Sequence, residues 1–157
     1  AGIDPSSAAI IFPEGTFFTE ERRDRAAARL ATHRPDLETK ARSLRYVLPP
    51  RTAGTMILLN GAPEADVVIL ANVGLEGFGS LNQIMTNIAE PKTVDVQIWR
   101  HERSDLPTSE HDLNTWLLDR WLEMDEWIHQ QLASREDRAT NMPNTHRETG
   151  AAVAEAQ

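Results

Sequence analysis

Hydrophobic and polar positions along the chain form runs that predict short strands separated by helices. A continuous apolar run at 8–12 and two largely apolar segments at 45–48 and 66–73 have the length of strands. The first is typical of a buried strand, the second is halted by Pro49-Pro50, and the third is the strongest strand signal in the chain. The stretch 94–100 alternates apolar and polar side chains, which predicts a half-exposed strand at the edge of a sheet.

Helical segments are expected between these strands. Thr19 followed by Glu20 and Glu21 is typical of a helix start, because a hydroxyl N-cap and early acids stabilise the first turn. That helix is expected to run through Leu30 and to stop before Pro35, with further helices at 37–44 and 55–59. Strands that alternate with helices predict the α/β fold class, with a partial, largely parallel sheet and flanking helices.

The last predicted element is a long helix at 110–132. Its apolar side chains recur every three or four residues: Leu113, Leu117, Trp121, Met124, Ile128 and Leu132. The polar face carries mostly acids (Asp119, Glu123, Asp125 and Glu126), which anionic lipid would repel, so packing on the sheet is expected rather than a membrane-surface position. The segment that follows is polar, small and without period. We therefore expect one domain at 1–133 and a disordered tail at 134–157.

Composition and charge exclude some classes of site and indicate where an anionic partner could bind. The chain has 157 residues, a net charge of −8 and no cysteine, which excludes disulfides, zinc–thiolate sites and thiol nucleophiles. Residues 22–51 nevertheless carry nine bases against three acids. This basic block indicates either an anionic partner or a solvated helix face. Nucleic acid is not the expected partner, because the chain is acidic overall and aromatic side chains are not interleaved with these bases.

The most informative motif is Phe12-Pro13-Glu14-Gly15-Thr16, directly after the first apolar run. A glycine allows close backbone approach to a ligand, and a carboxylate accepts hydrogen bonds from substrate hydroxyls. In an open α/β sheet, such a turn lies at the carboxyl edge where ligands bind. An ordinary structural turn has the same composition, so both interpretations stay open at this point.

This motif resembles the Phe-Pro-Glu-Gly-Thr motif of the glycerolipid (lysophosphatidate) acyltransferase family. Val47-Leu48-Pro49-Pro50-Arg51 resembles the family's later proline motif, and 66–69 is similar to its next core strand. The resemblance implies transfer of a fatty acyl group from a thioester donor, acyl-CoA or acyl carrier protein, to a lysophospholipid such as 1-acylglycerol-3-phosphate. It implies no cofactor beyond that co-substrate, no metal, and a role in phospholipid biosynthesis. It also implies attachment of the parent protein to the cytoplasmic face of a membrane, although no run in this chain approaches the ~20 apolar residues of a spanning helix.

Two features depart from the family pattern. Arg usually follows Glu-Gly-Thr, where it suits a phosphate, but this chain has Phe17. Either the acceptor differs, or Arg22, Arg23 or Arg51 supplies the charge, and the basic block that begins directly after the motif favours the second alternative. The predicted acceptor-binding residues are Glu14, Gly15, Thr16, Arg22 and Arg51.

The second departure concerns catalysis. The family's His-x-x-x-x-Asp motif supplies a general base, and none of the five histidines here has Asp at the fifth following position. No catalytic residue is therefore assigned, and because the chain opens on Ala1 we expect a C-terminal part of a longer acyltransferase. The alternatives are a non-catalytic lipid- or anion-binding module derived from that fold, or an acidic interaction protein with a coincidental turn.

Overall fold

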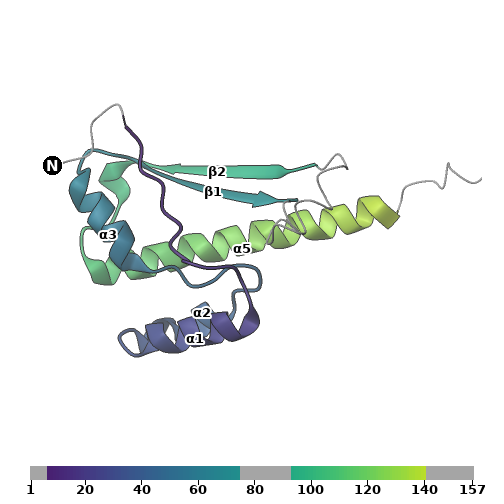
Figure 1. The fold of residues 1–157 in the computed structure, drawn as a ribbon, viewed down its shortest axis with the longest axis horizontal. Coiled ribbons are helices and arrows are strands. Elements are labelled where there is room, and N and C mark those ends of the chain that lie inside the picture. Colours follow the sequence, from purple (N-terminus) through teal and green to yellow (C-terminus); the bar gives the residue numbers. More distant parts are fainter. Residues whose placement is uncertain (1–6, 75–92, 141–157) are drawn as a thin grey trace, which may run out of the picture.

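The computed structural model describes residues 7–74 and 93–140, and it shows a mixed α/β fold with a long C-terminal helix (Figure 1). The helices are α1 (Glu20–Ala31), α2 (Glu38–Arg42), α3 (Thr52–Gly61) and α5 (Glu110–Thr140). Short 3-10 turns lie at η1 (Pro35–Leu37) and η2 (Arg103–Asp105). The strands are β1 (Val67–Val73) and β2 (Asp95–His101).

Helix α1 begins where its capping residues predict. The Thr19 side chain accepts a hydrogen bond from the Arg22 N–H at 3.2 Å, and Glu20 and Glu21 occupy the first turn. Both features offset unsatisfied N–H groups and the positive end of the helix dipole. The helix expected at 37–44 is shorter than predicted and is divided into η1 and α2.

Strands β1 and β2 form an antiparallel ribbon in which Leu70 lies opposite Ile98. The prediction of a largely parallel sheet is therefore wrong for the part of the chain that the structure describes. That prediction counted four strands separated by helical segments. Two of those strands do not form, and the two that do are consecutive in the described chain.

The ribbon buries only one of its faces. Ile69, Ala71 and Val73 are buried on the side of α5, whereas the opposite face carries side chains that are 52–59% exposed: Val68, Leu70, Val96 and Ile98. The predicted half-exposed strand at 94–100 is confirmed as β2. The continuous apolar run of β1, however, alternates between buried and exposed positions.

Residues 8–12 do not form the predicted buried strand. Ile10 is 85% exposed and Phe12 is 82% exposed, and no described strand pairs with this segment. Instead, Ile11 lies on α3, where a Cβ added to Gly54 would be 2.7 Å from Ile11 Cδ1. An apolar run becomes a buried strand only where neighbouring strands accept its backbone hydrogen bonds.

The strand predicted at 45–48 is also absent, and a buried acid explains why. The backbone N–H groups of Arg45 and Tyr46 both donate to Asp125 Oδ1 at 2.7 Å. These two donors are therefore not available for a β-ladder. The segment forms bends that pass over α5 instead.

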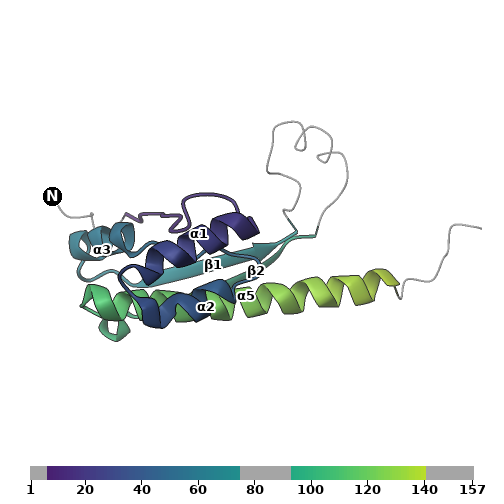
Figure 2. The ribbon, with the colours of Figure 1, turned by 90° about the horizontal axis from the view of Figure 1, so that it is seen from below.

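Helix α5 lies beneath the ribbon (Figure 2) and contributes more residues to the buried core cluster than any other described element. Leu113, Leu117, Trp121 and Met124 are at most 6% exposed, which confirms packing on the sheet. Asp125, expected on the polar face, is instead buried. The helix continues to Thr140, so the first residues of the predicted tail are helical, and 141–157 lie outside the described residues. No helix in the described ranges is long and apolar enough to span a membrane.

Candidate functional site

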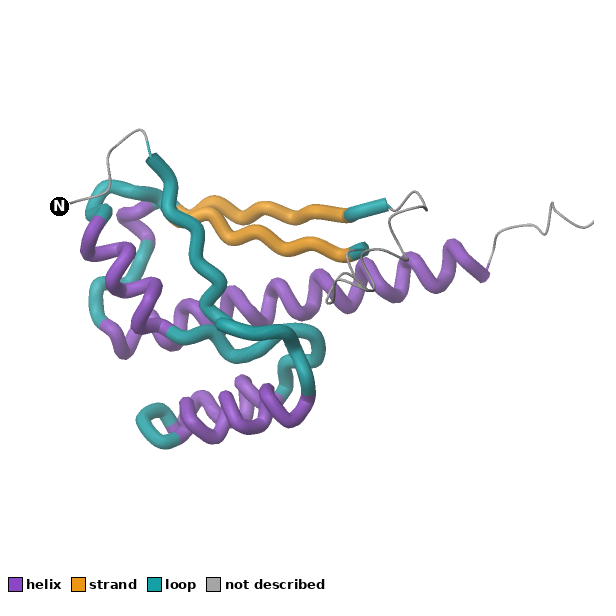
Figure 3. The backbone as a smooth tube through the Cα atoms, in the orientation of Figure 1, coloured by secondary structure: helices purple, strands orange, loops and turns teal. Residues whose placement is uncertain are grey.

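Two loops cross beside α5 (Figure 3). Of the predicted site residues, Glu14, Gly15, Thr16 and Arg51 belong to these loops, whereas Arg22 lies in the first turn of α1. In the first loop, the Gly15 N–H donates to the Phe12 carbonyl at 3.1 Å, which closes a turn over Pro13 and Glu14. Gly15 has φ +70°, a conformation that glycine adopts without steric cost. The second loop, 43–51, is joined to this turn by the Arg51 N–H, which donates to the Pro13 carbonyl at 3.0 Å.

The Glu14 carboxylate points into the protein. Its Oε2 accepts a hydrogen bond from the Leu48 N–H at 2.9 Å, and its Oε1 accepts one from Trp121 Nε1 at 3.2 Å. Burial raises the pKa of the Glu14 carboxyl, and the two hydrogen bonds act against that rise. The predicted contact of Glu14 with a substrate hydroxyl stays a prediction, since both oxygens already have protein donors.

Gly15 and Arg51 form the exposed surface of the turn. The Arg51 guanidinium lies against Gly15, where an added Cβ would be 3.4 Å from Arg51 Cζ. Arg51 is exposed, and within residues 7–74 and 93–140 its guanidinium has no hydrogen bond or ion pair. The arrangement places an unpaired cation beside a glycine backbone, which is suited to an anion.

Thr16, Phe17 and Arg22 continue this surface toward α1. Thr16 is exposed, and Phe17, which replaces the family's Arg, is 72% exposed. Arg22 Nη1 donates to the Phe17 carbonyl at 3.1 Å. That bond keeps the Arg22 side chain beside the turn while leaving its charge without a carboxylate partner among the described residues.

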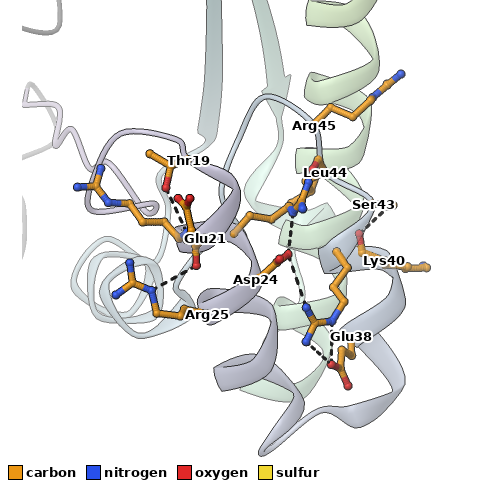
Figure 4. Close-up of polar contacts among 12 residues, drawn as sticks. Thr19, Glu21, Asp24, Arg25, Glu38, Lys40, Ser43, Leu44 and Arg45 are labelled. Atoms are coloured by element: carbon orange, nitrogen blue, oxygen red, sulfur yellow. Dashed lines mark hydrogen bonds and ion pairs between the residues drawn. The ribbon is translucent and has the colours of Figure 1, made fainter.

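The basic block at 22–51 contains both paired and unpaired cations. Figure 4 draws the polar contacts around Asp24 and Glu38, the acids of α1 and α2 that take part in these pairs. Five of its nine bases form ion pairs with acids of α1, α5 or the η1–α2 segment: Arg23, Arg34, Lys40, Arg42 and Arg45. Three of these five bases connect separate segments, because Lys40 pairs with Asp119, Arg42 with Asp24 and Arg45 with Asp125. Of the three candidates for the missing positive charge, Arg23 is engaged by Asp24 and by the Leu44 carbonyl, whereas Arg22 and Arg51 form no ion pair with any residue that the structure describes.

Trp121 and Leu48 contact the site without having been predicted as site residues. Trp121 appeared in the sequence only as part of the apolar stripe of α5, and nothing in its spacing indicates a bond to a turn 107 residues earlier. No metal-binding group of three or more His, Cys, Asp and Glu side chains occurs in the described part of the chain.

Two of the histidines that the structure describes make their contacts away from this turn. His129 Nδ1 is 3.0 Å from the Tyr46 hydroxyl, and His101 packs edge-on against Trp116 at 4.9 Å. Neither is in contact with the Glu14–Gly15 turn.

Comparison with known proteins shows that the chain belongs to the acyltransferase family. A family model described as the acyltransferase C-terminus matches residues 85–137. The chain is also 30% identical over 134 residues to lysophosphatidylinositol acyltransferase 10 of Caenorhabditis elegans. No solved structure matches the chain. These matches confirm the acyltransferase family resemblance that the motifs indicated, and lipid acyltransferases are the class that the findings support.

The match covers the two proteins unequally. It includes 81% of this chain but 32% of the worm protein, so the chain spans about a third of the length of that relative.

Proposed function

We propose that this chain carries the acceptor-binding part of a lysophospholipid acyltransferase. The observation that carries the proposal is the unpaired Arg51 guanidinium beside Gly15, at the turn that matches the family motif. Arg51 contacts the phosphate of a lysophospholipid such as 1-acylglycerol-3-phosphate, and Arg22 adds charge from α1. Gly15 and Thr16 line the same surface, and Phe17 contacts the apolar part of the acceptor.

The remaining parts of the reaction come from outside this chain. A general base removes the proton of the acceptor hydroxyl, and no histidine here has the spacing of the family motif for that task. Acyl-CoA or acyl carrier protein is the co-substrate that donates the acyl group. The complete protein works in phospholipid biosynthesis at the cytoplasmic face of a membrane. The worm relative's name, a lysophosphatidylinositol acyltransferase, supports an acceptor with a phosphate next to its glycerol.

A binding experiment tests the acceptor site. The purified chain is titrated with short-chain lysophosphatidate below its micelle concentration, and the dissociation constant is measured by calorimetry. Arg51→Gln should weaken binding roughly 10- to 100-fold, as expected for loss of a charged hydrogen-bonding partner. Arg29→Gln is the matched control, because Arg29 is an exposed and unpaired base of the same block. Equal affinities in all three proteins would refute the proposed site.

A non-catalytic anion-binding module is the second candidate, favoured by the lack of a histidine with the family spacing. A chimeric protein distinguishes the acyltransferase function from the anion-binding module. The aligned residues of this chain replace their counterparts in the worm acyltransferase, and acyl transfer to lysophospholipid is measured in membranes. Activity that depends on Arg51 supports the acyltransferase function. A folded, expressed chimera that binds lysophosphatidate but transfers nothing would favour the module.

A further inference from the structure

A buried hydrogen-bond chain connects α5 to the candidate phosphate-binding arginine. It begins at Trp121, whose side chain is 6% exposed and whose indole N–H donates to Glu14 Oε1 at 3.2 Å. The other carboxylate oxygen of Glu14 accepts the Leu48 N–H at 2.9 Å. One carboxylate therefore links three segments that are far apart in the sequence: the turn at 12–15, the loop at 43–51 and α5.

Both donors to Glu14 belong to buried residues. Leu48 is 2% exposed, so its N–H would be unsatisfied if the carboxylate turned outward. The same holds for the Trp121 indole N–H, which lies within the core cluster. Because an unpaired buried donor is costly, these two bonds fix the direction of the Glu14 side chain and with it the path of the turn.

The fixed turn determines where the Arg51 guanidinium lies. Arg51 follows Leu48 by three residues, and its own N–H donates to the Pro13 carbonyl at 3.0 Å. The turn and the loop are therefore joined by two hydrogen bonds, at Pro13 and at Glu14, and the Arg51 side chain rests on Gly15 as a result. A displacement of the turn would move the glycine surface against which the cation is placed.

We propose that Trp121 is a positioning residue for the acceptor site, acting through Glu14 and the 48–51 loop to hold Arg51 against Gly15. Glu14 links Trp121 to the 48–51 loop, because its carboxylate accepts hydrogen bonds from both and points into the protein. This inference rests on the proposed function, because the ligand that reports on it is the phosphate-bearing acceptor.

The test uses Trp121→Phe, which removes the indole N–H and retains an aromatic ring in the core. Trp127→Phe is the matched control on the same helix, because Trp127 is half-buried and no described residue accepts a hydrogen bond from its indole. We expect Trp121→Phe to weaken binding of short-chain lysophosphatidate roughly fivefold to tenfold and the control to change it less than about twofold. Glu14→Gln, which keeps the side-chain size, is the second variant and should weaken binding to a similar extent.

A double-mutant cycle separates positioning from general support of the fold. If Trp121 acts through Arg51, Trp121→Phe should have less than about a twofold effect in an Arg51→Gln background. An undiminished effect in that background would overturn the proposal, as would a Trp121→Phe protein that loses melting temperature but binds with unchanged affinity. Should Trp121→Phe fail to fold, Glu14→Gln is carried through the same cycle, with the same outcomes.

A second measurement tests the positioning role of Trp121 separately from the proposed binding of lysophosphatidate. Backbone amide signals of Gly15 and Arg51 are compared by NMR in the unliganded wild-type, Trp121→Phe and Trp127→Phe chains. Displacement of both signals in Trp121→Phe alone supports the positioning role, even if the wild-type chain binds no lysophosphatidate and the proposed function fails. Unchanged signals at Gly15 and Arg51 would overturn the positioning role.

Discussion

The Asp125 carboxylate, only 2% exposed, accepts hydrogen bonds from both the backbone N–H and the side-chain Nε of Arg45, at 2.7 and 3.0 Å. A third bond comes from the Tyr46 N–H. This acid therefore fastens the loop that leads to the candidate site onto α5. The sequence placed Asp125 on the solvated face of α5, but in the structure this acid binds the backbone of a segment 80 residues earlier.

Asp125→Ala should accordingly destabilise the chain strongly. The substitution leaves two backbone donors in a site shielded from water and removes the partner of a half-exposed arginine, so we expect a loss of about 2–4 kcal/mol in the free energy of unfolding. Urea denaturation followed by circular dichroism measures it. Glu126→Gln is the control, because Glu126 also pairs with Arg45 but is exposed, and it should change stability little. Similar losses in both variants would contradict the role given to Asp125.

The two faces of the ribbon should respond differently to truncation. Ile69 is 7% exposed on the side of α5, whereas Ile98 on the adjacent strand is 57% exposed on the opposite face. Ile69→Ala should cost about 2–5 kcal/mol, as is typical for a buried isoleucine. Ile98→Ala should stay within about 0.5 kcal/mol of the wild type, the usual range for surface positions. Thermal and urea unfolding of both variants measure the difference, and equal losses would mean that the outer face is covered.

Local signals predicted the elements whose formation depends on nearby residues. The Thr19 cap, the alternation in β2 and the stripe of α5 each act within a few turns or strand residues, and each is present in the structure. The strands at 8–12 and 45–48 failed because a strand depends on partners elsewhere in the chain. The first has no described strand beside it, and the second has its N–H groups bound to Asp125.

The candidate site was predictable only in part, for the same reason. The motif indicated Glu14, Gly15 and Arg51, and the structure brings these three together at the crossing of two loops. The partners of Glu14 were not predictable. A carboxylate that faces a substrate and one that accepts bonds from Leu48 and Trp121 have the same sequence signature, and only the packing of α5 distinguishes them.

Glu14 should make a distinctive contribution to the pH dependence of stability. Burial raises the pKa of its carboxyl in the folded state, so between the unfolded and folded values the folded chain binds more protons than the unfolded chain. Stability from this group therefore increases as the pH falls through its folded pKa. We expect the free energy of unfolding of the wild type to rise relative to that of Glu14→Gln as the pH falls from neutral toward the usual titration range of a glutamate carboxyl. Denaturation of both proteins across that range measures this difference in unfolding free energy. Acids with lowered pKa values, such as Asp36 and Asp66, contribute equally to the stability of both proteins, so their contributions cancel in the difference.

His101 should contribute with the opposite sign. Burial, followed by the nearby Arg120 charge, lowers the pKa of its imidazole, although Glu123 and Asp105 act in the other direction. The unfolded chain therefore binds the proton more readily, and stability from this group is lost as the pH falls below the usual range for histidine. His101→Phe, which retains an aromatic contact with Trp116, should remove that loss between pH 7.5 and 5.5. A wild type and a variant with parallel pH profiles would show that His101 titrates normally.

Phe17 marks the position at which this chain leaves the family pattern, and its replacement tests which cation serves the phosphate. If Arg51 and Arg22 hold the phosphate, Phe17→Arg should change lysophosphatidate affinity less than about twofold, because the charge is already matched. The new side chain would also lie near the Arg22 guanidinium, which donates to the Phe17 carbonyl.

An acceptor with a less charged head group gives a different result from the same variant. Phe17 would then offer that head group an apolar surface, since its side chain is 72% exposed. In that case Phe17→Arg should shift the ratio of affinities for short-chain lysophosphatidate and lysophosphatidylcholine by roughly tenfold toward lysophosphatidate. We expect the first outcome, because the Arg51 guanidinium rests on the motif glycine without a carboxylate partner in the described chain. Competition between the two lipids, in the wild type, Phe17→Arg and Arg51→Gln, decides between them. A lysophosphatidate preference that survives Arg51→Gln and Arg22→Gln would refute the assignment of the phosphate to these arginines.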